Sequence, residues 1–211
     1  RRTFKWRQAN PLASLGLLRR SQLLTALAGS LFLSNLANHG LYSTWVFSTT
    51  LRFDWNSVTT GIVFTLIGVC TALAQGFLVG PMVKRLGERR SVLLGLSVSM
   101  LAFLAYALAP QGWMIYLIIA VSSFGAVDEP ASQALVSGSV GEDEQGAVQG
   151  ALASLISLTA VFGPLFSTSM FSYFVSENAP VYFPGAPFAL GAVLIACALL
   201  LAWRFVRPSQ H

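Results

Sequence analysis

The sequence predicts an all-α membrane protein with six transmembrane helices. Of its 211 residues, 55% are hydrophobic and only 10% are charged, whereas soluble domains carry about 25% charged residues. The mean hydropathy is +0.66, and the apolar residues form long stretches separated by short polar breaks. A transmembrane helix needs about 20 apolar residues, so a chain of this length accommodates six spans but not twelve.

Charged residues, prolines and glycines divide the apolar stretches into six expected helices. These helices cover residues 22–50, 57–83, 91–109, 112–138, 146–175 and 181–204. The short connections are typical of a compact helical bundle. We therefore expect a cytoplasmic linker or amphipathic segment over residues 1–20, the six-helix domain over 21–207, and a cytoplasmic tail over 208–211.

The first 20 residues alternate apolar and basic side chains. This pattern predicts an interfacial amphipathic helix that begins near Asn10, and residues 1–9 either extend it or form a linker. The chain starts at Arg1 and shows no signal peptide. We expect it to be part of a longer protein.

The basic residues predict the orientation in the membrane. Apart from Arg52, all Lys and Arg residues lie in the N-terminal segment, in the loop after the second expected helix, or near the C-terminus. Because short basic loops stay in the cytoplasm, both termini are expected there, in a multi-pass protein of a bacterial cytoplasmic (inner) membrane. Anionic lipid accounts for the net charge of +5, so we expect the lipid bilayer as a partner and no nucleic acid.

Asp128 and Glu129 are ionisable residues within the expected span 112–138. Such residues are costly in hydrocarbon and normally face a cavity or a partner, and Pro130 loosens the helix beside them. Adjacent helical residues point about 100° apart, so the two carboxylates cannot face the same surroundings. We predict a proton-coupling role for them; the alternative is a structural carboxylate that bonds to a neighbouring helix.

A polar stripe runs along the first expected helix. Asn35, Asn38, His39 and Tyr42 recur at helical spacing in an otherwise apolar span. Together with Gln133, they are predicted to line a substrate cavity. A polar seam between packed helices is the alternative interpretation.

Cys70 and Cys197 lie within apolar runs, away from acidic or histidine residues at metal-ligand spacing. This placement excludes a disulfide framework and a zinc site and indicates ordinary packing residues. We expect no metal and no cofactor.

The most specific motif covers residues 80–90, between the second and third expected helices. It resembles the signature loop of the major facilitator superfamily, which reads roughly G-x-L-a-D-R-x-G-R-R, although Lys84 stands in place of its Asp and Glu88 in place of a basic residue. The residues that carry the resemblance are Gly80, Lys84, Arg85, Gly87, Arg89 and Arg90.

The resemblance covers nearly the whole chain and is to the C-terminal half of the tetracycline/proton antiporter group. It rests on Asn10-Pro11-Leu12, Arg52-Phe53-Asp54-Trp55, Ala72-Leu73-Ala74-Gln75, Pro130 with Gln133-Ala134-Leu135, Gln145-Gly146, and Ser157-Leu158-Thr159 before Gly163-Pro164. It implies helices seven to twelve of a transporter, built as two inverted three-helix repeats. The implied activity is proton-driven efflux of a small amphiphilic, drug-like compound by alternating access. An N-terminal six-helix half, on the same or a separate chain, is the implied partner.

Glycines four residues apart let helices approach closely in lipid. Gly76 and Gly80 form one such pair and Gly146 and Gly150 another, on the second helices of the two implied repeats. By the family resemblance these helices contact the N-terminal half, and Gly163 and Pro164 are assigned to the same contact. The alternative is ordinary glycine, which is frequent in membrane helices.

One departure from the family concerns its titratable groups. The tetracycline exporters have a histidine and an essential aspartate at positions that align with Thr71 and Ser99 here. The sequence therefore predicts neither tetracycline as the substrate nor the usual proton site, and Asp128 and Glu129 are candidates to replace it.

Two other classes of six-helix membrane protein are alternatives to a transporter. An intramembrane protease is excluded, because His39 precedes every candidate serine and Asp128 has no second intramembrane aspartate on another helix. A non-transporting six-helix scaffold, or a half-transporter for another metabolite that must dimerise, stays open as the alternative function.

Overall fold

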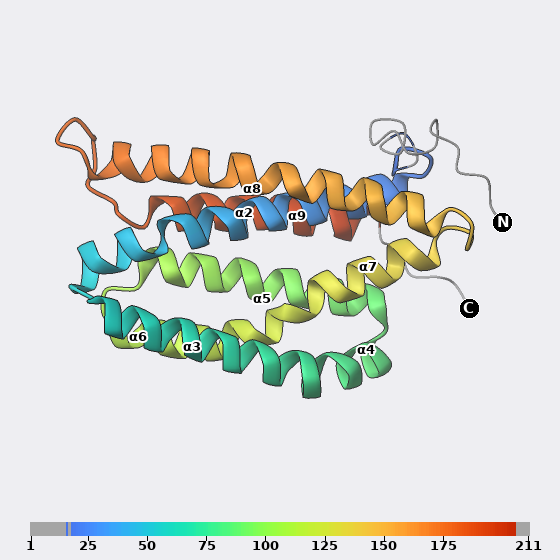
Figure 1. Cartoon of the computed structure of the whole chain (residues 1–211), viewed down its shortest axis with the longest axis horizontal. Helices are drawn as coiled ribbons and strands as arrows, with labels where there is room; N and C mark the ends of the chain where they lie inside the picture. The colour runs from blue at the N-terminus through green and yellow to red at the C-terminus, as the bar shows by residue number, and fades with distance from the viewer. Residues whose placement is uncertain (1–15, 17, 206–211) are drawn as a thin grey trace.

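The computed structural model describes residue 16 and residues 18–205, and every regular element in this part of the chain is a helix. The longer helices run side by side along the length of the molecule (Figure 1). The elements are α2 (Gln22–Phe53), α3 (Ser57–Leu73), η2 (Ala74–Val79), α4 (Gly80–Leu86), α5 (Glu88–Leu108), α6 (Gly112–Ser122), η3 (Ser123–Val127), α7 (Asp128–Gly138), α8 (Gln145–Val175) and α9 (Ala186–Phe205). The predicted all-α membrane fold is confirmed. The helix expected near Asn10 begins outside the described residues.

These elements form six continuous rods in the described part of the chain. The π-helical η2 joins α3 to α4, and the 3₁₀-helical η3 joins α6 to α7. Five rods are long and apolar enough to cross a membrane: Ser57–Leu86, Glu88–Leu108, Gly112–Gly138, Gln145–Val175 and Ala186–Phe205. The sixth, α2, has 32 residues and carries the polar stripe, and it is not among these five.

Two helices begin three or more residues away from the predicted position. α5 begins at Glu88 rather than 91, because Gly87 adopts a φ of 77° and turns the chain within a single residue. α9 begins at Ala186 rather than 181. Pro184 explains this later start, because a proline disfavours helical backbone at the residue before it.

The contacts between rods follow the order expected of two inverted repeats. α2 packs on α8 and α9, and the α6–α7 rod packs in the same way on α3 and α5. α5 and α9, the third helices of the two halves, pack on each other. Exchanging the first three rods with the last three therefore reproduces the contacts, and the two sets run in opposite directions along the bundle (Figure 1).

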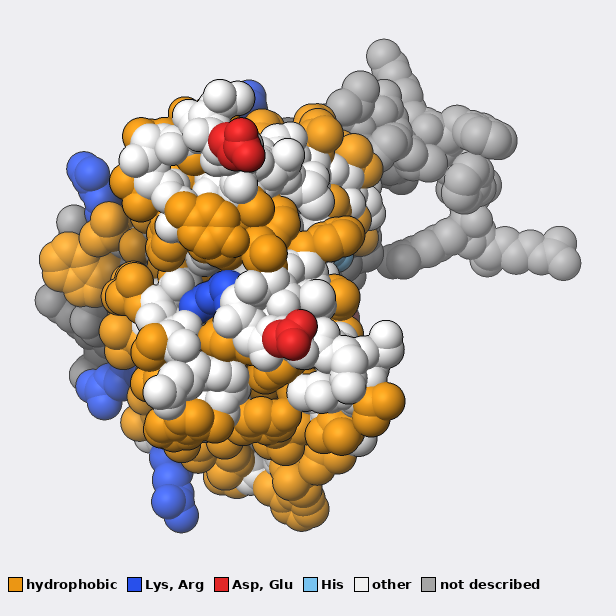
Figure 2. Space-filling model, turned by 90° about the vertical axis from the view of Figure 1, so that its left-hand side faces the viewer, with side chains coloured by type: hydrophobic (Ala, Val, Ile, Leu, Met, Phe, Trp, Pro, Cys, Tyr) orange, Lys and Arg blue, Asp and Glu red, His pale blue; other side chains and the backbone are white. Residues whose placement is uncertain are grey.

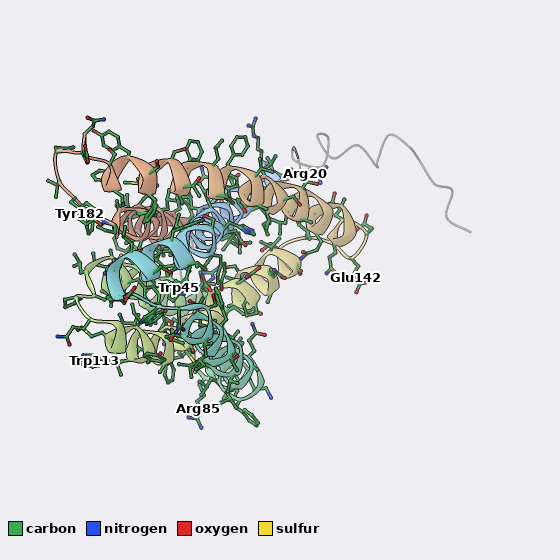
Figure 3. The ribbon with its side chains drawn as sticks, turned by 60° about the vertical axis from the view of Figure 1, so that its left-hand side comes forward. Arg20, Trp45, Arg85, Trp113, Glu142 and Tyr182 are labelled. Atoms are coloured by element: carbon green, nitrogen blue, oxygen red, sulfur yellow. The ribbon has the colours of Figure 1, made fainter. Side chains whose placement is uncertain are left out.

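Charged and aromatic side chains separate toward the two ends of the bundle. Trp113 and Tyr182 lie at one end, and Arg20 and Glu142 lie at the other (Figure 3). The end surface shown in Figure 2 is mostly apolar or uncharged. Of the described Lys and Arg residues, only Arg52 belongs to the end that carries Trp113; the others lie at the start of α2, around the α4–α5 turn and at the end of α9.

α2 and α8 approach each other closely at two glycines. A Cβ atom added to Gly163 on α8 would lie 2.9 Å from the Cβ of His39 and 3.0 Å from the carbonyl oxygen of Leu36. A Cβ added to Gly40 on α2 would collide with the side chain of Ser167. Small residues at this crossing therefore bring the two backbones together, as is usual for helices that pack in lipid.

Candidate functional site

A cavity of about 360 Å³ lies between α2, the α3–η2 segment, α5 and the α6–α7 rod. Four of the five residues predicted to face substrate line it: Asn35, Asn38, His39 and Tyr42. Asp128 and Glu129 line the same cavity from the opposite rod. The structure therefore brings the polar stripe and the intramembrane carboxylates together, although they lie almost ninety residues apart in the sequence.

Gln133 does not line the cavity. It lies one turn beyond Glu129 on α7, and its Nε2 donates a hydrogen bond to Glu129 Oε1 at 3.2 Å. The prediction that Gln133 lines the cavity is therefore not met in this structure. Its contact is with a cavity carboxylate, whose orientation it restrains.

The two asparagines of α2 donate hydrogen bonds along their own helix. Asn35 Nδ2 donates to the Leu31 carbonyl at 3.0 Å, and Asn38 Nδ2 donates to the Ser34 carbonyl at 2.9 Å. Each bond uses one of the two N–H donors of its amide. The amide oxygens are left as acceptors at the cavity wall, where a polar or cationic occupant can bind them.

Asp128 and Glu129 have different surroundings. Asp128 is half-buried and packs against α5, where a Cβ added to Gly95 would lie 2.7 Å from the Asp128 Cβ. Glu129 is exposed and bonded to Gln133. The 3₁₀ segment η3, which presses Gly125 close to α5, sets the start of α7 and thus the direction of both carboxylates.

Aromatic side chains form the other wall of the cavity. Trp45 is 1% exposed and lines the cavity, and its ring meets that of Tyr106 edge to face at 5.3 Å between centroids. Phe103 also lines this wall. Sequence reasoning missed these three residues, although Trp45 follows Asn38 and Tyr42 at spacings that keep it on the same side of α2.

Thr71 on α3 and Ser99 on α5 also line the cavity. These are the positions at which the resemblance implies titratable groups. Hydroxyl side chains therefore occupy cavity positions where titratable groups were implied. Among the described residues that line the cavity, the acidic groups are Asp128 and Glu129, and no Lys or Arg is present.

The signature loop is a tight turn at one end of the bundle. Gly80 opens α4, Lys84 and Arg85 lie in its last turn, and the Gly87 N–H donates to the Val83 carbonyl at 2.9 Å. Arg89 and Arg90 lie in the first turn of α5. The turn gathers the four basic side chains of this motif at the end of the bundle where α2 begins and α9 ends (Figure 1).

The glycines assigned to the contact with a second half fall into two groups. Gly76, Gly80, Gly146 and Gly150 are exposed, and a Cβ added to any of them would meet nothing within 4 Å. Gly163 is instead buried against α2 of the same chain. Its assignment to the half–half contact is corrected accordingly, and Pro164 beside it is half-buried within α8.

The sequence model described as Major Facilitator Superfamily matches residues 21–211. The chain belongs to the major facilitator superfamily. Membership in this superfamily places the protein among transporters rather than enzymes, and it confirms the family resemblance found in the sequence.

Individual superfamily members resemble this chain over most of its length. The class C tetracycline resistance protein of Escherichia coli is 33% identical over 96% of the chain and 51% of its own length. The class G tetracycline resistance protein of Vibrio anguillarum is 38% identical over 71% of the chain and 38% of its own length. The crystal structure of the human organic anion transporter MFSD10 (TETRAN) matches with a TM-score of 0.78 and 27% identity, over 95% of this chain and 49% of that one. The chain thus spans about half the length of the relatives it matches.

Proposed function

We propose that this chain forms the C-terminal six-helix half of a proton-coupled exporter of small amphiphilic compounds, which works by alternating access. The observation that carries the proposal is the cavity in which the polar stripe of α2 faces Asp128 and Glu129. Carboxylates at membrane depth beside a cavity mark ion or proton pathways. The names of the relatives, tetracycline resistance proteins and an organic anion transporter, agree with a small-molecule cargo.

Asp128 is the residue we propose as the proton carrier. It is half-buried at the contact with α5, whereas Glu129 is exposed and restrained by Gln133. A carboxylate that is shielded in one conformation and open to water in another can bind a proton in the first and release it in the second. Proton transfer is then coupled to the conformational cycle. His39 also lines the cavity, so its contribution has to be measured alongside that of Asp128.

A second six-helix half is the partner we propose for the α3–η2–α4 rod and for α8. Both helices expose glycines and large apolar side chains away from the rest of the bundle. The glycine pairs lie on the second helix of each repeat, so one symmetric partner surface would cover both. This half is either part of the same natural chain or separate from it.

The orientation we propose places both termini in the cytoplasm of a bacterial inner membrane. The turn with Lys84, Arg85, Arg89 and Arg90 would then be a cytoplasmic loop, as the positive-inside rule requires. Trp113 and Tyr182 would lie at the outer interface. The proton gradient drives the cycle, without a cofactor.

Transport in everted membrane vesicles tests the coupling. The protein is expressed at its natural length, a proton gradient is imposed, and proton release is followed with a pH-sensitive dye when a candidate cargo is added. We expect Asp128→Asn to abolish cargo-dependent proton release and Glu129→Gln to reduce it. Glu142→Gln, which removes a carboxylate from the α7–α8 loop outside the cavity, is the matched control and should behave as the natural protein does.

The coupling proposal fails if both cavity variants retain pH-driven transport. Loss of transport together with loss of the protein from the membrane would instead indicate misfolding, so the amount of each variant in the vesicles is measured in parallel. A protein that moves no cargo and no protons would favour the alternative of a six-helix scaffold.

A further inference from the structure

We infer that the cavity selects organic cations with an aromatic body, whose charge binds at Asp128 and Glu129 while the aromatic part packs on Trp45, Tyr106 and Phe103. This inference rests on the proposed function and narrows its cargo to one chemical class. It follows from the charge, depth and shape of the cavity wall. The name of the structural relative, an organic anion transporter, would suggest the opposite charge.

The charge of the lining favours a cation. Two carboxylates line the cavity, and no Lys or Arg lines it among the described residues. The amide oxygens of Asn35 and Asn38 add neutral acceptors, while one N–H of each amide is bonded to a carbonyl of α2. An anion would meet carboxylates and acceptors without a compensating charge from this half, whereas a cation would be stabilised by all four groups.

The aromatic residues lie at a different depth from the carboxylates. Trp45 is about 12 Å from the Phe53 end of α2, and Asp128 is about 24 Å from the Gly112 end of the α6–α7 rod, as measured by helix rise. These two helix ends lie at the same end of the bundle (Figure 1). The aromatic and acidic parts of the wall are therefore separated by about 12 Å along the membrane normal. This separation suits an occupant whose charge lies at the carboxylates and whose aromatic body extends toward Trp45.

The aromatic end also carries an unpartnered polar group. The indole Nε1 of Trp45 is buried and has no hydrogen-bond partner among the described residues, although buried donors nearly always have one. Trp45 lines the cavity and lies in the interior of the bundle (Figure 3). The missing partner is a hydrogen-bond acceptor, which a polar atom on the aromatic part of an occupant would supply.

A pair of probes that differ in charge but hardly in shape tests the inference. Tetraphenylphosphonium and tetraphenylborate each carry four phenyl groups around one central atom, with opposite charges. Binding of each radiolabelled probe to the detergent-purified protein, at its natural length, is measured by equilibrium dialysis. We expect tetraphenylphosphonium to bind at least about tenfold more tightly, because the carboxylates act across a site partly shielded from water.

Variants locate the binding site. Asp128→Asn and Glu129→Gln should each weaken tetraphenylphosphonium binding at least about fivefold, while Glu142→Gln leaves it unchanged. Trp45→Ala should weaken binding of both probes, because both carry aromatic rings. Comparing the probes on the unmodified protein keeps the test decisive even if a variant fails to fold.

Tighter or equal binding of tetraphenylborate would overturn the inference, as would unchanged tetraphenylphosphonium binding in both carboxylate variants. These failures can be told apart from failure of the proposed function. Proton release driven by a neutral or anionic cargo, and lost in Asp128→Asn, would preserve the exporter while overturning the cation selectivity. Specific tetraphenylphosphonium binding without proton release would preserve the selectivity while overturning the coupling.

Discussion

The close approach of α2 and α8 makes a specific prediction for the substitution Gly163→Ala. The new Cβ would lie 2.9 Å from the Cβ of His39, 3.0 Å from the Leu36 carbonyl oxygen and 3.2 Å from the Gly40 nitrogen. Two of these neighbours are backbone atoms, which cannot rotate away. The helices must therefore separate, and overpacking of this kind costs about 1–3 kcal/mol.

The matched control is Gly150→Ala on the same helix, where an added Cβ meets nothing within 4 Å. Both substitutions gain about 1 kcal/mol of helix propensity, so this contribution cancels in the comparison. With overpacking near the upper end of its range, Gly163→Ala should be less stable than Gly150→Ala by about 3 kcal/mol. For a chain of this size that difference corresponds to a Tm lower by about 6–12 °C.

The assay is thermal unfolding of the purified protein in detergent, at its natural length, followed by fluorescence and by loss of the monodisperse peak. We expect Gly150→Ala to unfold at or above the temperature of the natural protein and Gly163→Ala clearly below it. Equal Tm values for the two alanine variants would refute the close α2–α8 crossing. A lowered Tm in both would indicate that the exposed glycines also contribute to packing within a single half.

Three further predictions concern other parts of the bundle. Gly146→Leu should abolish transport but change the unfolding temperature of the isolated chain little, because this glycine is exposed; unchanged transport would argue against the proposed half–half contact. Arg52 donates hydrogen bonds to the Tyr106 carbonyl at 2.8 Å and the Ala107 carbonyl at 3.3 Å. Arg52→Gln should therefore lower the free energy of unfolding by about 1–3 kcal/mol, measured by thermal or denaturant unfolding. A variant as stable as the natural protein would contradict this. Gln133→Leu removes the hydrogen bond to Glu129 and should raise the KM for cargo severalfold at constant expression. An unchanged KM in Gln133→Leu would show that the amide donor has no role.

Helix positions could be predicted from the sequence because they depend on local properties. The break before α3 contains Asp54 in a left-handed conformation and the N-cap Asn56, whose side chain accepts from the Thr59 N–H. The break between α4 and α5 depends on Gly87. The irregular segments η2 and η3 were not predicted, because the backbone there follows packing between rods rather than residue propensity.

The cavity was predicted only in part. Polar residues in an apolar helix are conspicuous, so Asn35, Asn38 and His39 could be recognised. Trp45 was missed, because a tryptophan in a membrane helix can equally face lipid, a neighbouring helix or a cavity, and its spacing from Asn38 and Tyr42 was the one signal that placed it on the polar side of α2. Gln133 was misplaced for a related reason: one turn of α7 separates it from the cavity wall, and only its bond to Glu129 reveals its position.

Hydropathy and charge along the chain are properties of single residues and their neighbours in sequence. They were enough to determine the all-α membrane class and the helix positions to within a few residues, whereas the family resemblance rests on the motif at residues 80–90 and the shorter matching strings. The tertiary structure alone distinguished the buried Gly163 from the exposed Gly150, and the half-buried Asp128 from the exposed, hydrogen-bonded Glu129. These distinctions depend on how each helix is rotated against its neighbours, and that rotation is decided by packing between segments far apart in the sequence.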